Sequence, residues 1–347
     1  MNIYEKRVRE LSAAIKKEKL EALVVSRLED VGFLTGFHLE GCLLLVGKSE
    51  VRAFTSKMLR DHVSSKVPFA ETISSDNIRN SVFEFAQKKK IKKIAFEPET
   101  VSYLDGLFWK KKGFAAKGGF VSSLRQVKKE AELINVSRSC RIAAEVFPII
   151  KKKIKKGRSE ISVARQIEDL MQARGAYGPS FRIIVAFGEN SALPHHETSE
   201  RRLKNNETVL IDYGCVYNFY CSDMTRTFFY GRPSAEFRKV YSIVQEAQKR
   251  GIKAVKSGTR ASFVDKVVRE HISDNGYGQY FIHGTGHGIG LEIHESPLVN
   301  SKSKAVLKTG MCLTVEPGIY LKGKFGVRIE DSLLVGKKGS KILTKAG

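Results

Sequence analysis

Four acidic residues lie in two β-rich stretches of this chain, where isolated charges are unexpected. Asp212 ends the apolar run TVLID, and Asp223 follows in CSDMTRT. Strand side chains alternate between faces, so a hairpin turn between them directs both carboxylates to one face. They are directly opposite if the turn centres on residues 217–218, and diagonal neighbours if it centres on 218–219. Two buried carboxylates at that separation repel unless a cation or a proton lies between them, and Arg226 is one candidate counter-ion.

A second β-rich stretch repeats the pattern, with Glu316 in LTVEPG and Glu330 in VRIEDS on either side of a turn near Gly323. Their separation is even, so a simple hairpin directs both side chains to the same face. Four such carboxylates are difficult to satisfy with salt bridges alone. Divalent cations with oxygen ligands would satisfy them, and two ions about 3.5–4 Å apart need bridging carboxylates of this kind.

Histidines and glycines recur in HGTGHGIGLEIHESP, residues 283–297. The spacing matches neither the GxGxxG of dinucleotide-binding proteins nor the GKS or GKT ending of a phosphate-binding loop. The glycines therefore indicate close approach to the backbone, and one histidine of the run can bind a metal through a neutral imidazole nitrogen. The remaining histidines, with His195 and His196 in NSALPHH, are candidates for moving a proton or stabilising a tetrahedral intermediate.

The elements that position these residues fall into two parts. The first, residues 1–125, is predicted to be a small α/β domain, with helices at 7–19 and 77–90 and strands in ALVVSR, GCLLLVG, VRAFTS and KKIAFEP. The polar segment LRQVKKEAEL marks the boundary. The second part, residues 126–347, is predicted to be α+β, with antiparallel hairpins between helices at 130–152, 160–173, 234–256 and 262–274.

Length and composition agree with a globular protein of two domains, since the chain has 347 residues and 42% of them are hydrophobic. No apolar run is long enough to cross a bilayer, and the N-terminal segment has no signal-peptide core, so we expect a cytoplasmic protein without a membrane partner. The five cysteines form no CxxC pair and are expected to be reduced. The net charge of +23 favours anionic partners, but the lysines are dispersed and accompany no nucleic-acid motif, so we expect solvated surface instead of nucleic-acid binding.

Several motifs in fixed order resemble those of the pita-bread metallopeptidases, which include Xaa-Pro aminopeptidase, prolidase and methionine aminopeptidase. They are NSALPHH, the pair DYG and CSDMTRT, HGTGHGIGLEIHE, VEPGIY and GVRIED. Towards the N-terminus, LEDVGFLTGF and LRQVKKEAEL resemble the creatinase-type domain and junction of the proline-specific members. The resemblance implies an α+β pita-bread catalytic domain at residues 126–347, preceded by a smaller α/β creatinase-type domain at residues 1–125.

The resemblance also implies a binuclear metal site. In it, Asp212 binds one ion, Asp223 and Glu330 bridge both ions, and His287 and Glu316 complete the second. Mn²⁺ is the expected metal, with Co²⁺, Zn²⁺ and Fe²⁺ as alternatives. Further residues are expected to contact the substrate or to orient the ligands. These residues are His195, His283, His294, Arg328 and Tyr213, with substrate binding assigned to His283 and Arg328.

The implied reaction is hydrolysis of the peptide bond that precedes proline. Glu316 is expected to accept the proton of a water held between the ions, His294 to stabilise the oxyanion, and His195 or Glu316 to protonate the leaving nitrogen. Because a proline amide has no N–H, a pocket shaped for its ring is expected, lined by His283 and His294.

Within this family the sequence favours an Xaa-Pro aminopeptidase, with Xaa-Pro dipeptidase (prolidase) as the alternative. Many prolidases place an arginine after the HExP-type segment to clamp the carboxylate of a dipeptide, whereas Leu298 follows Pro297 here. Two more distant alternatives are a non-catalytic relative that binds nucleic acid or protein and a metal-free creatinase-like amidinohydrolase. Both are disfavoured because all five ligand positions are intact. The expected partners are proline-containing peptides and a second copy of the chain, since relatives often dimerise through the N-terminal domain.

Overall fold

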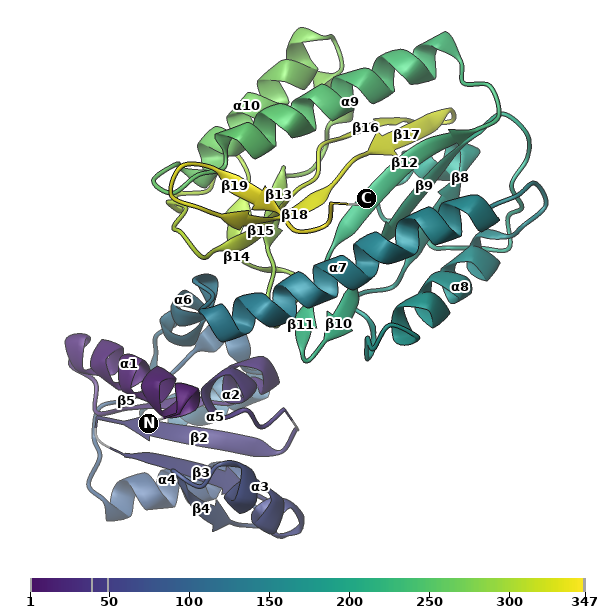
Figure 1. Ribbon diagram of the computed structural model, residues 1–347. Coiled ribbons are helices and arrows are strands. Elements are labelled where there is room, and N and C mark those ends of the chain that lie inside the picture. The colour runs from purple at the N-terminus through teal and green to yellow at the C-terminus, as the bar shows by residue number, and fades with distance from the viewer. Residues whose placement is uncertain (1, 39, 49, 346–347) are drawn as a thin grey trace. The chain divides into compact units, whose positions relative to one another are not determined.

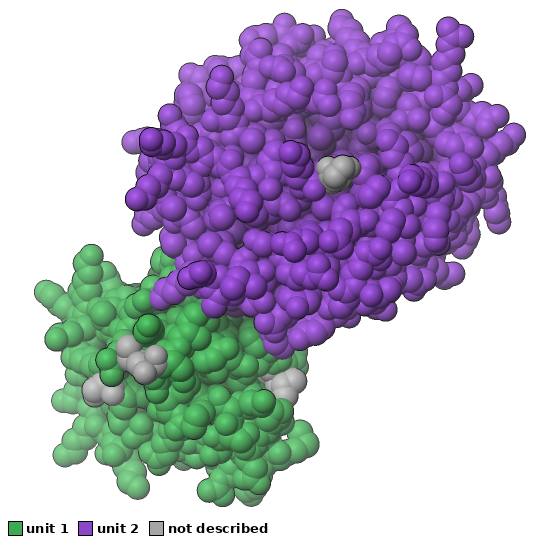
Figure 2. All heavy atoms as spheres, in the orientation of Figure 1, with its two compact units in different colours: residues 1–125 green, residues 126–347 purple. Residues whose placement is uncertain are grey.

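The computed structural model describes residues 2–38, 40–48 and 50–345. The chain divides into two compact units, residues 1–125 and residues 126–347 (Figure 2). Among the described residues, no helix combines the length and the apolar content needed to span a membrane. Every residue of the predicted metal site belongs to the second unit.

Unit 1 is built on a six-stranded mixed sheet with the order β4-β3-β2-β1-β5-β6 (Figure 1). At its centre, β1 pairs antiparallel with β2 and parallel with β5. The strands are β1 Ala22–Val25, β2 Cys42–Gly47, β3 Val51–Thr55, β4 Glu71–Ser74, β5 Ile94–Phe96 and β6 Ala115–Ala116. The helices are α1 Ile3–Lys17, α2 Leu28–Thr35, α3 Arg60–Lys66, α4 Ile78–Lys88, α5 Tyr103–Lys111 and α6 Phe120–Gln126, with 3₁₀ helices η1 Lys57–Leu59 and η2 Pro98–Thr100.

The core of unit 1 lies between the sheet and its helices. Val82 of α4 and Trp109 of α5 pack against Phe54 of β3 and Phe96 of β5. The predicted helices at 7–19 and 77–90 correspond to α1 and α4. Helix α2 was not predicted, because nearly every residue of LEDVGFLT after the first turn is buried and the segment lacks an amphipathic period.

Unit 2 places its sheets between two pairs of helices (Figure 1). The sheets have the orders β12-β9-β8, β11-β10-β7, β14-β13-β15-β18-β19 and β16-β17. The helices are α7 Glu130–Lys153, α8 Glu160–Gln172, α9 Ala235–Ala254 and α10 Ala261–Asp274, with η3 Gly188–Ala192 and η4 Gly278–Tyr280. The strands are β7 Gly178–Pro179, β8 Ile184–Phe187, β9 Glu207–Tyr213, β10 Cys215–Tyr217, β11 Tyr220–Cys221, β12 Met224–Tyr230, β13 Gly286–Gly288, β14 Glu295–Val299, β15 Cys312–Val315, β16 Gly318–Leu321, β17 Phe325–Arg328, β18 Asp331–Val335 and β19 Ser340–Ile342.

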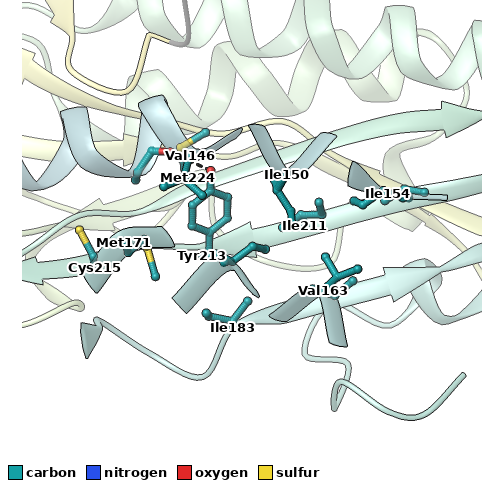
Figure 3. Packing of buried hydrophobic residues seen from close by; sticks show 14 of the residues in the cluster. Val146, Ile150, Ile154, Val163, Met171, Ile183, Ile211, Tyr213, Cys215 and Met224 are labelled. Carbon is teal, nitrogen blue, oxygen red and sulfur yellow. Dashed lines mark hydrogen bonds between the residues drawn. The ribbon is translucent and has the colours of Figure 1, made fainter. Parts of the chain in front are cut away.

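Each helix pair covers the strands that carry one part of the predicted site. Val146 of α7 and Val163 of α8 belong to one buried cluster with Ile211 of β9 and Met224 of β12 (Figure 3). Helices α9 and α10 pack in the same way against β15 to β18 through two further clusters. The hairpins therefore rest on rigid apolar layers, and their other faces are available for polar side chains.

Candidate metal centre

The hairpin that carries Asp212 and Asp223 turns at Asn218 and Phe219. Both turn residues have positive φ angles, 45° and 70°, as a tight type I′ hairpin requires. The pairing of β9 with β12 places Asp212 opposite Thr225. Asp223 precedes Thr225 by two residues and is therefore a diagonal neighbour of Asp212 on the same face. Of the two turn positions that the sequence left open, the later one is correct.

Glu316 and Glu330 lie opposite each other at the junction of two strand pairs. On one side of them, Val315 of β15 pairs with Asp331 of β18. On the other side, β16 pairs with β17 in the same register. The two glutamates are thus cross-strand neighbours, in agreement with the prediction from their even separation.

His287 occupies the middle of β13, between Gly286 and Gly288. A Cβ atom would lie 2.1 Å from the carbonyl oxygen of Thr314 at Gly286, and 2.5 Å from that of Ser296 at Gly288. Only glycine therefore permits the neighbouring backbones to approach, as the sequence indicated. Nδ1–H of His287 donates to the carbonyl oxygen of Gly288 at 3.1 Å, which leaves the Nε2 lone pair for a metal ion.

These side chains converge in the folded chain. Nε2 of His287 lies 3.4 Å from Oδ2 of Asp223 and 3.5 Å from Oε1 of Glu316. Asp223, His287 and Glu330 each offer a ligand atom within 4.8 Å of the others. Oδ1 of Asp212, Oδ1 of Asp223 and Oε1 of Glu330 are buried without a hydrogen-bond partner. Because buried acceptors are nearly always satisfied, this donor set of carboxylates and one imidazole fits a divalent cation.

The pKa values of the carboxylates agree with a site for a cation. Burial raises the pKa of Asp223 well above its ordinary value, and the adjacent charge of Asp212 raises it further. Burial also raises the pKa of Glu330 and of Glu316, in the latter case against the opposing effect of His287. A bound cation favours the ionised carboxylates, so uptake of the cation is coupled to loss of protons.

Arg328 of β17 donates hydrogen bonds to residues of β9, β12 and β16, beside the candidate ligands. Its Nη2 donates to Oδ2 of Asp212 at 2.5 Å, and its Nε donates to Oγ1 of Thr225 at 3.0 Å. The hydroxyl of Thr225 donates in turn to Oε2 of Glu330 at 2.8 Å. Burial opposes the charge of Arg328, but Tyr320 and Asp212 outweigh burial and hold its pKa well above its ordinary value. The guanidinium therefore stays charged and fixes one oxygen of each of two carboxylates, directly or through Thr225.

The prediction that Arg226 could be the counter-ion of Asp212 is wrong. Arg226 directs its guanidinium to the other face of β12, where Nη2 donates to Oδ1 of Asp331 at 2.7 Å. The reason is the strand alternation itself, because Thr225 is the residue opposite Asp212 and its neighbour must point away.

Tyr213 is likewise not a neighbour of the predicted ions, contrary to the expectation from the sequence. Its ring is fully buried in the apolar cluster beneath β9, beside Val146 and Met224 (Figure 3). Its hydroxyl donates to the carbonyl oxygen of Ala143 at 2.8 Å. Tyr213 follows Asp212 directly and so lies on the opposite face of the strand.

His283 is held by hydrogen bonds at both ring nitrogens. Nδ1–H donates to the carbonyl oxygen of Gly284 at 2.7 Å, and Nε2 accepts from the hydroxyl of Tyr320 at 2.8 Å. Tyr320 also accepts from Nη1 of Arg328 at 2.8 Å. Burial lowers the pKa of His283 to about 4, which keeps the ring neutral and consistent with this arrangement. Tyr320, which the sequence did not single out, thus links His283 to the arginine of the site.

A cavity of about 540 Å³ opens beside the ligand set, and the predicted residues His195, His283 and His294 all line it. The rings of His294 and His287 are perpendicular neighbours with centroids 4.3 Å apart. Burial lowers the pKa of His294, and the nearby histidines lower it further. An apolar wall completes the cavity, and it consists of Phe181, Ile184, Pro194, Ile293 and Leu298. A cavity with polar groups on one side and an apolar wall is typical of a site for a small molecule or a peptide.

The loop that carries His195 is anchored by Glu160, a fully buried carboxylate at the start of α8. Glu160 lies 2.8 Å from Nε2 of His196 and accepts from the backbone N–H of Phe187 at 2.8 Å. It also accepts from the backbone and hydroxyl of Ser199, at 3.1 Å and 2.7 Å. Sequence reasoning missed Glu160, because its partners are remote in the chain and its position resembles an ordinary first-turn acid.

Comparison with known families agrees with the fold and the site. Residues 135–337 match the model of metallopeptidase family M24, and residues 7–142 match the creatinase/prolidase N-terminal domain. The chain therefore belongs to metallopeptidase family M24. It is a peptidase with a creatinase-type N-terminal domain and a pita-bread catalytic domain, as the motifs predicted.

Individual relatives give finer information. An Xaa-Pro dipeptidase from Pyrococcus furiosus is 44% identical over 225 residues, which cover 65% of this chain and 65% of that protein. The structure of an Xaa-Pro dipeptidase from Bacillus anthracis has a TM-score of 0.95 and 34% identity, covering 99% of this chain and 98% of the other. The structure of an X-Pro aminopeptidase from Thermotoga maritima has a TM-score of 0.85 and 33% identity, covering 94% and 96%.

Proposed function

We propose that this chain is an Xaa-Pro dipeptidase that works with two divalent ions. The observation that carries the proposal is the convergence of four carboxylates and one imidazole beside a cavity with an apolar wall. The preference for proline and for dipeptides rests on the similarity to Xaa-Pro dipeptidases from two organisms. The sequence favoured an aminopeptidase, whereas the relatives favour the alternative, and we adopt the alternative.

Five residues would hold the ions, and the unpartnered buried oxygens of three of them, Asp212, Asp223 and Glu330, support this role. They are Asp212, Asp223, His287, Glu316 and Glu330. When bound, the ions would polarise the substrate carbonyl and lower the pKa of a water molecule. A ligand set of carboxylates with a single imidazole suits Mn²⁺, and Co²⁺, Zn²⁺ and Fe²⁺ are the alternatives to compare with it.

The remaining roles are assigned to side chains that line the cavity. Glu316, whose only hydrogen-bond donor among the described residues is Thr314 at 3.3 Å, would accept the proton of the attacking water. His294 would donate to the oxyanion and His195 to the leaving nitrogen, since both line the cavity. Arg328 and His283 would act on the substrate through the shape and charge of the cavity, because their nitrogens are bonded within the protein.

Xaa-Pro aminopeptidase is the second candidate. Leu298 lies in the cavity wall at the position where many prolidases have an arginine, and it offers no charge to a dipeptide carboxylate. The likeness to the Thermotoga maritima aminopeptidase also favours this candidate. An aminopeptidase accepts a chain that continues beyond proline, whereas a dipeptidase requires a free carboxylate there.

Substrate length tests the proposal. The enzyme would be stripped with a chelator, reconstituted with Mn²⁺, and assayed on Ala-Pro, Ala-Pro-Ala and Ala-Ala. The proposal predicts preferential cleavage of Ala-Pro, no restoration by Mg²⁺, and loss of activity in Asp223→Asn. Preference for Ala-Pro-Ala would select the aminopeptidase, and equal cleavage of Ala-Ala would remove the proline requirement. A homodimer stays a prediction, to be measured by light scattering during size-exclusion chromatography.

A further inference from the structure

A dipeptide differs from a longer peptide by a carboxylate on the proline, and a cation in the cavity would distinguish the two. Among the described residues that line the cavity, the permanently charged cations are Arg182 and Arg328. Arg328 is buried and already donates to Asp212, Tyr320 and Thr225. It therefore has little capacity left for a substrate anion.

Arg182 is in the opposite situation. Its side chain is 74% exposed, and its guanidinium Nη1 lies 3.9 Å from Oε1 of Glu197, beyond hydrogen-bond distance. The Glu197 side chain is itself 84% exposed, and an ion pair of this kind contributes little. Arg182 can therefore exchange this contact for a bidentate pair with another carboxylate.

The position of Arg182 in the fold relates it to the metal ligands. Ile184 of β8 is the direct cross-strand partner of Asp212, so their side chains share one face of the sheet. Arg182 precedes Ile184 by two residues, and both line the cavity. With a rise of about 3.3 Å per residue, Arg182 is roughly 7 Å along the chain from the residue that faces a metal ligand.

This distance suits a dipeptide. The carboxylate of an Xaa-Pro dipeptide lies within about one residue length, roughly 3.8 Å, of the carbonyl that is hydrolysed. A flexible arginine side chain that starts two residues away can reach that carboxylate, whereas Leu298 offers only an apolar contact. In a longer peptide the same position is a neutral amide, to which a guanidinium binds less strongly.

We propose that Arg182 binds the C-terminal carboxylate of the substrate and so sets the preference for dipeptides, with Glu197 as an internal competitor for its guanidinium. This inference rests on the proposed function, because it requires hydrolysis at an Xaa-Pro bond. It assigns the carboxylate clamp to the segment between β7 and β8, in place of the position that Leu298 occupies.

The test compares Ala-Pro with its C-terminal amide, Ala-Pro-NH₂, on the Mn²⁺-reconstituted full chain. Arg182→Ala should lower kcat/KM for Ala-Pro about 10- to 100-fold, mainly through KM, and change that for the amide less than about 2-fold. Arg182→Lys should be intermediate, because lysine keeps the charge without the bidentate geometry. Glu197→Gln should improve kcat/KM for Ala-Pro. Arg232→Ala, a loss of one exposed charge outside the cavity, is the matched control and should leave both substrates unaffected.

The outcomes separate the two proposals. Equal losses on Ala-Pro and its amide in Arg182→Ala, or no loss on Ala-Pro, would overturn the assignment of Arg182 and leave the dipeptidase function standing. A wild-type enzyme that prefers Ala-Pro-Ala would overturn the proposed function, and the carboxylate clamp with it.

Discussion

Nη2 of Arg328 lies 2.5 Å from Oδ2 of Asp212, while the other carboxylate oxygen of Asp212 has no hydrogen-bond partner. The arginine thus fixes the carboxylate through one oxygen and leaves the second for a cation. Mutation of a residue that positions a metal ligand commonly lowers metal affinity substantially. In this arrangement Arg328 positions the carboxylate, and Asp212 is the candidate ligand.

Arg328→Lys should therefore weaken metal binding without removing a ligand. Lysine keeps the positive charge but cannot bond Asp212, Thr225 and Tyr320 together, so we expect a loss of about 10- to 100-fold in Mn²⁺ affinity. Isothermal titration calorimetry on the chelator-treated protein measures it. Arg201→Lys is the matched control, because Arg201 pairs with Glu207, which is not a candidate ligand. An unchanged affinity in Arg328→Lys would contradict the positioning role.

Asp223→Asn should stabilise the protein in the presence of a chelator while abolishing activity. Burial and the neighbouring carboxylates raise the pKa of Asp223, so its ionised form is disfavoured without a cation. The neutral amide relieves that repulsion, and we expect Tm in EDTA to rise by about 2–4 °C. Added Mn²⁺ should raise Tm of the wild type and have little effect on the variant. A lower Tm of the variant in EDTA would count against a site arranged for a cation.

Metal uptake should release protons and strengthen as pH rises. The pKa values of Asp223, Glu330 and Glu316 are all raised, so the metal-free site holds protons that a cation must displace. Calorimetric titrations in buffers of different ionisation enthalpy would count the protons released. Binding with no proton release near neutral pH would contradict the raised pKa values.

Glu97 of unit 1 should make stability fall as pH rises. Burial raises its pKa from 4.5 to about 7, with Asp30 adding to the effect, although Oε1 accepts from the backbone N–H groups of Phe120 and Val121. Between these pH values the folded chain holds a proton that the unfolded chain has lost. Stability from this group is therefore complete below pH 4.5 and is lost as pH rises towards 7, by at most about 3 kcal/mol.

Glu97→Gln tests this pH dependence, because the amide oxygen can still accept both hydrogen bonds but does not titrate. The stability of the variant relative to the wild type should increase with pH across that window. Urea unfolding followed by fluorescence of Trp109, the single tryptophan and a residue of the same core, reports on unit 1. The exposed Glu84→Gln serves as control, and a pH-independent difference for Glu97→Gln would contradict the raised pKa.

Gly286→Ala should be severely destabilising. The added Cβ would lie 2.1 Å from the carbonyl oxygen of Thr314, a backbone atom that cannot move aside without disrupting β15. We expect a loss of about 3 kcal/mol or more, measured by chemical denaturation. Gly339→Ala is the matched control, since nothing lies within 4 Å of its added Cβ. Similar stabilities of the two variants would show that β13 tolerates a side chain beside His287.

Local alternation explains how much of the site the sequence could predict. Strand geometry alone places Asp212 and Asp223 on one face of their hairpin, and Glu316 and Glu330 on one face of theirs. The convergence of the acidic residues was therefore predictable. The register of the first hairpin was not, because it depends on which two residues adopt positive φ, and neither Asn218 nor Phe219 is glycine. The choice between dipeptidase and aminopeptidase could not be predicted from local pattern either. Leu298 favoured an aminopeptidase, whereas the relatives favour a dipeptidase.

Long-range partners account for what was missed or wrong. Arg226 was suggested by its proximity in sequence and Tyr213 by the family resemblance, and strand alternation places both on the opposite face. Tyr320, Thr225 and Glu160 carry no recognisable motif, and their roles arise from bonds to residues on other strands or loops. The fold class was predictable because the motifs and helical periods occur in a fixed order, whereas α2 was missed because it is buried on most sides.

The five candidate ligands come from β-segments that are distant in the chain and rest on different helix pairs. An ion bound among them is a reversible cross-link between the strands that pack on α7 and α8 and the strands that pack on α9 and α10. Chelation should accordingly accelerate amide hydrogen exchange along β9, β12, β13 and β17 together, instead of in one loop. The metal would then determine how long the catalytic unit survives heat or proteolysis, apart from any effect on peptide hydrolysis.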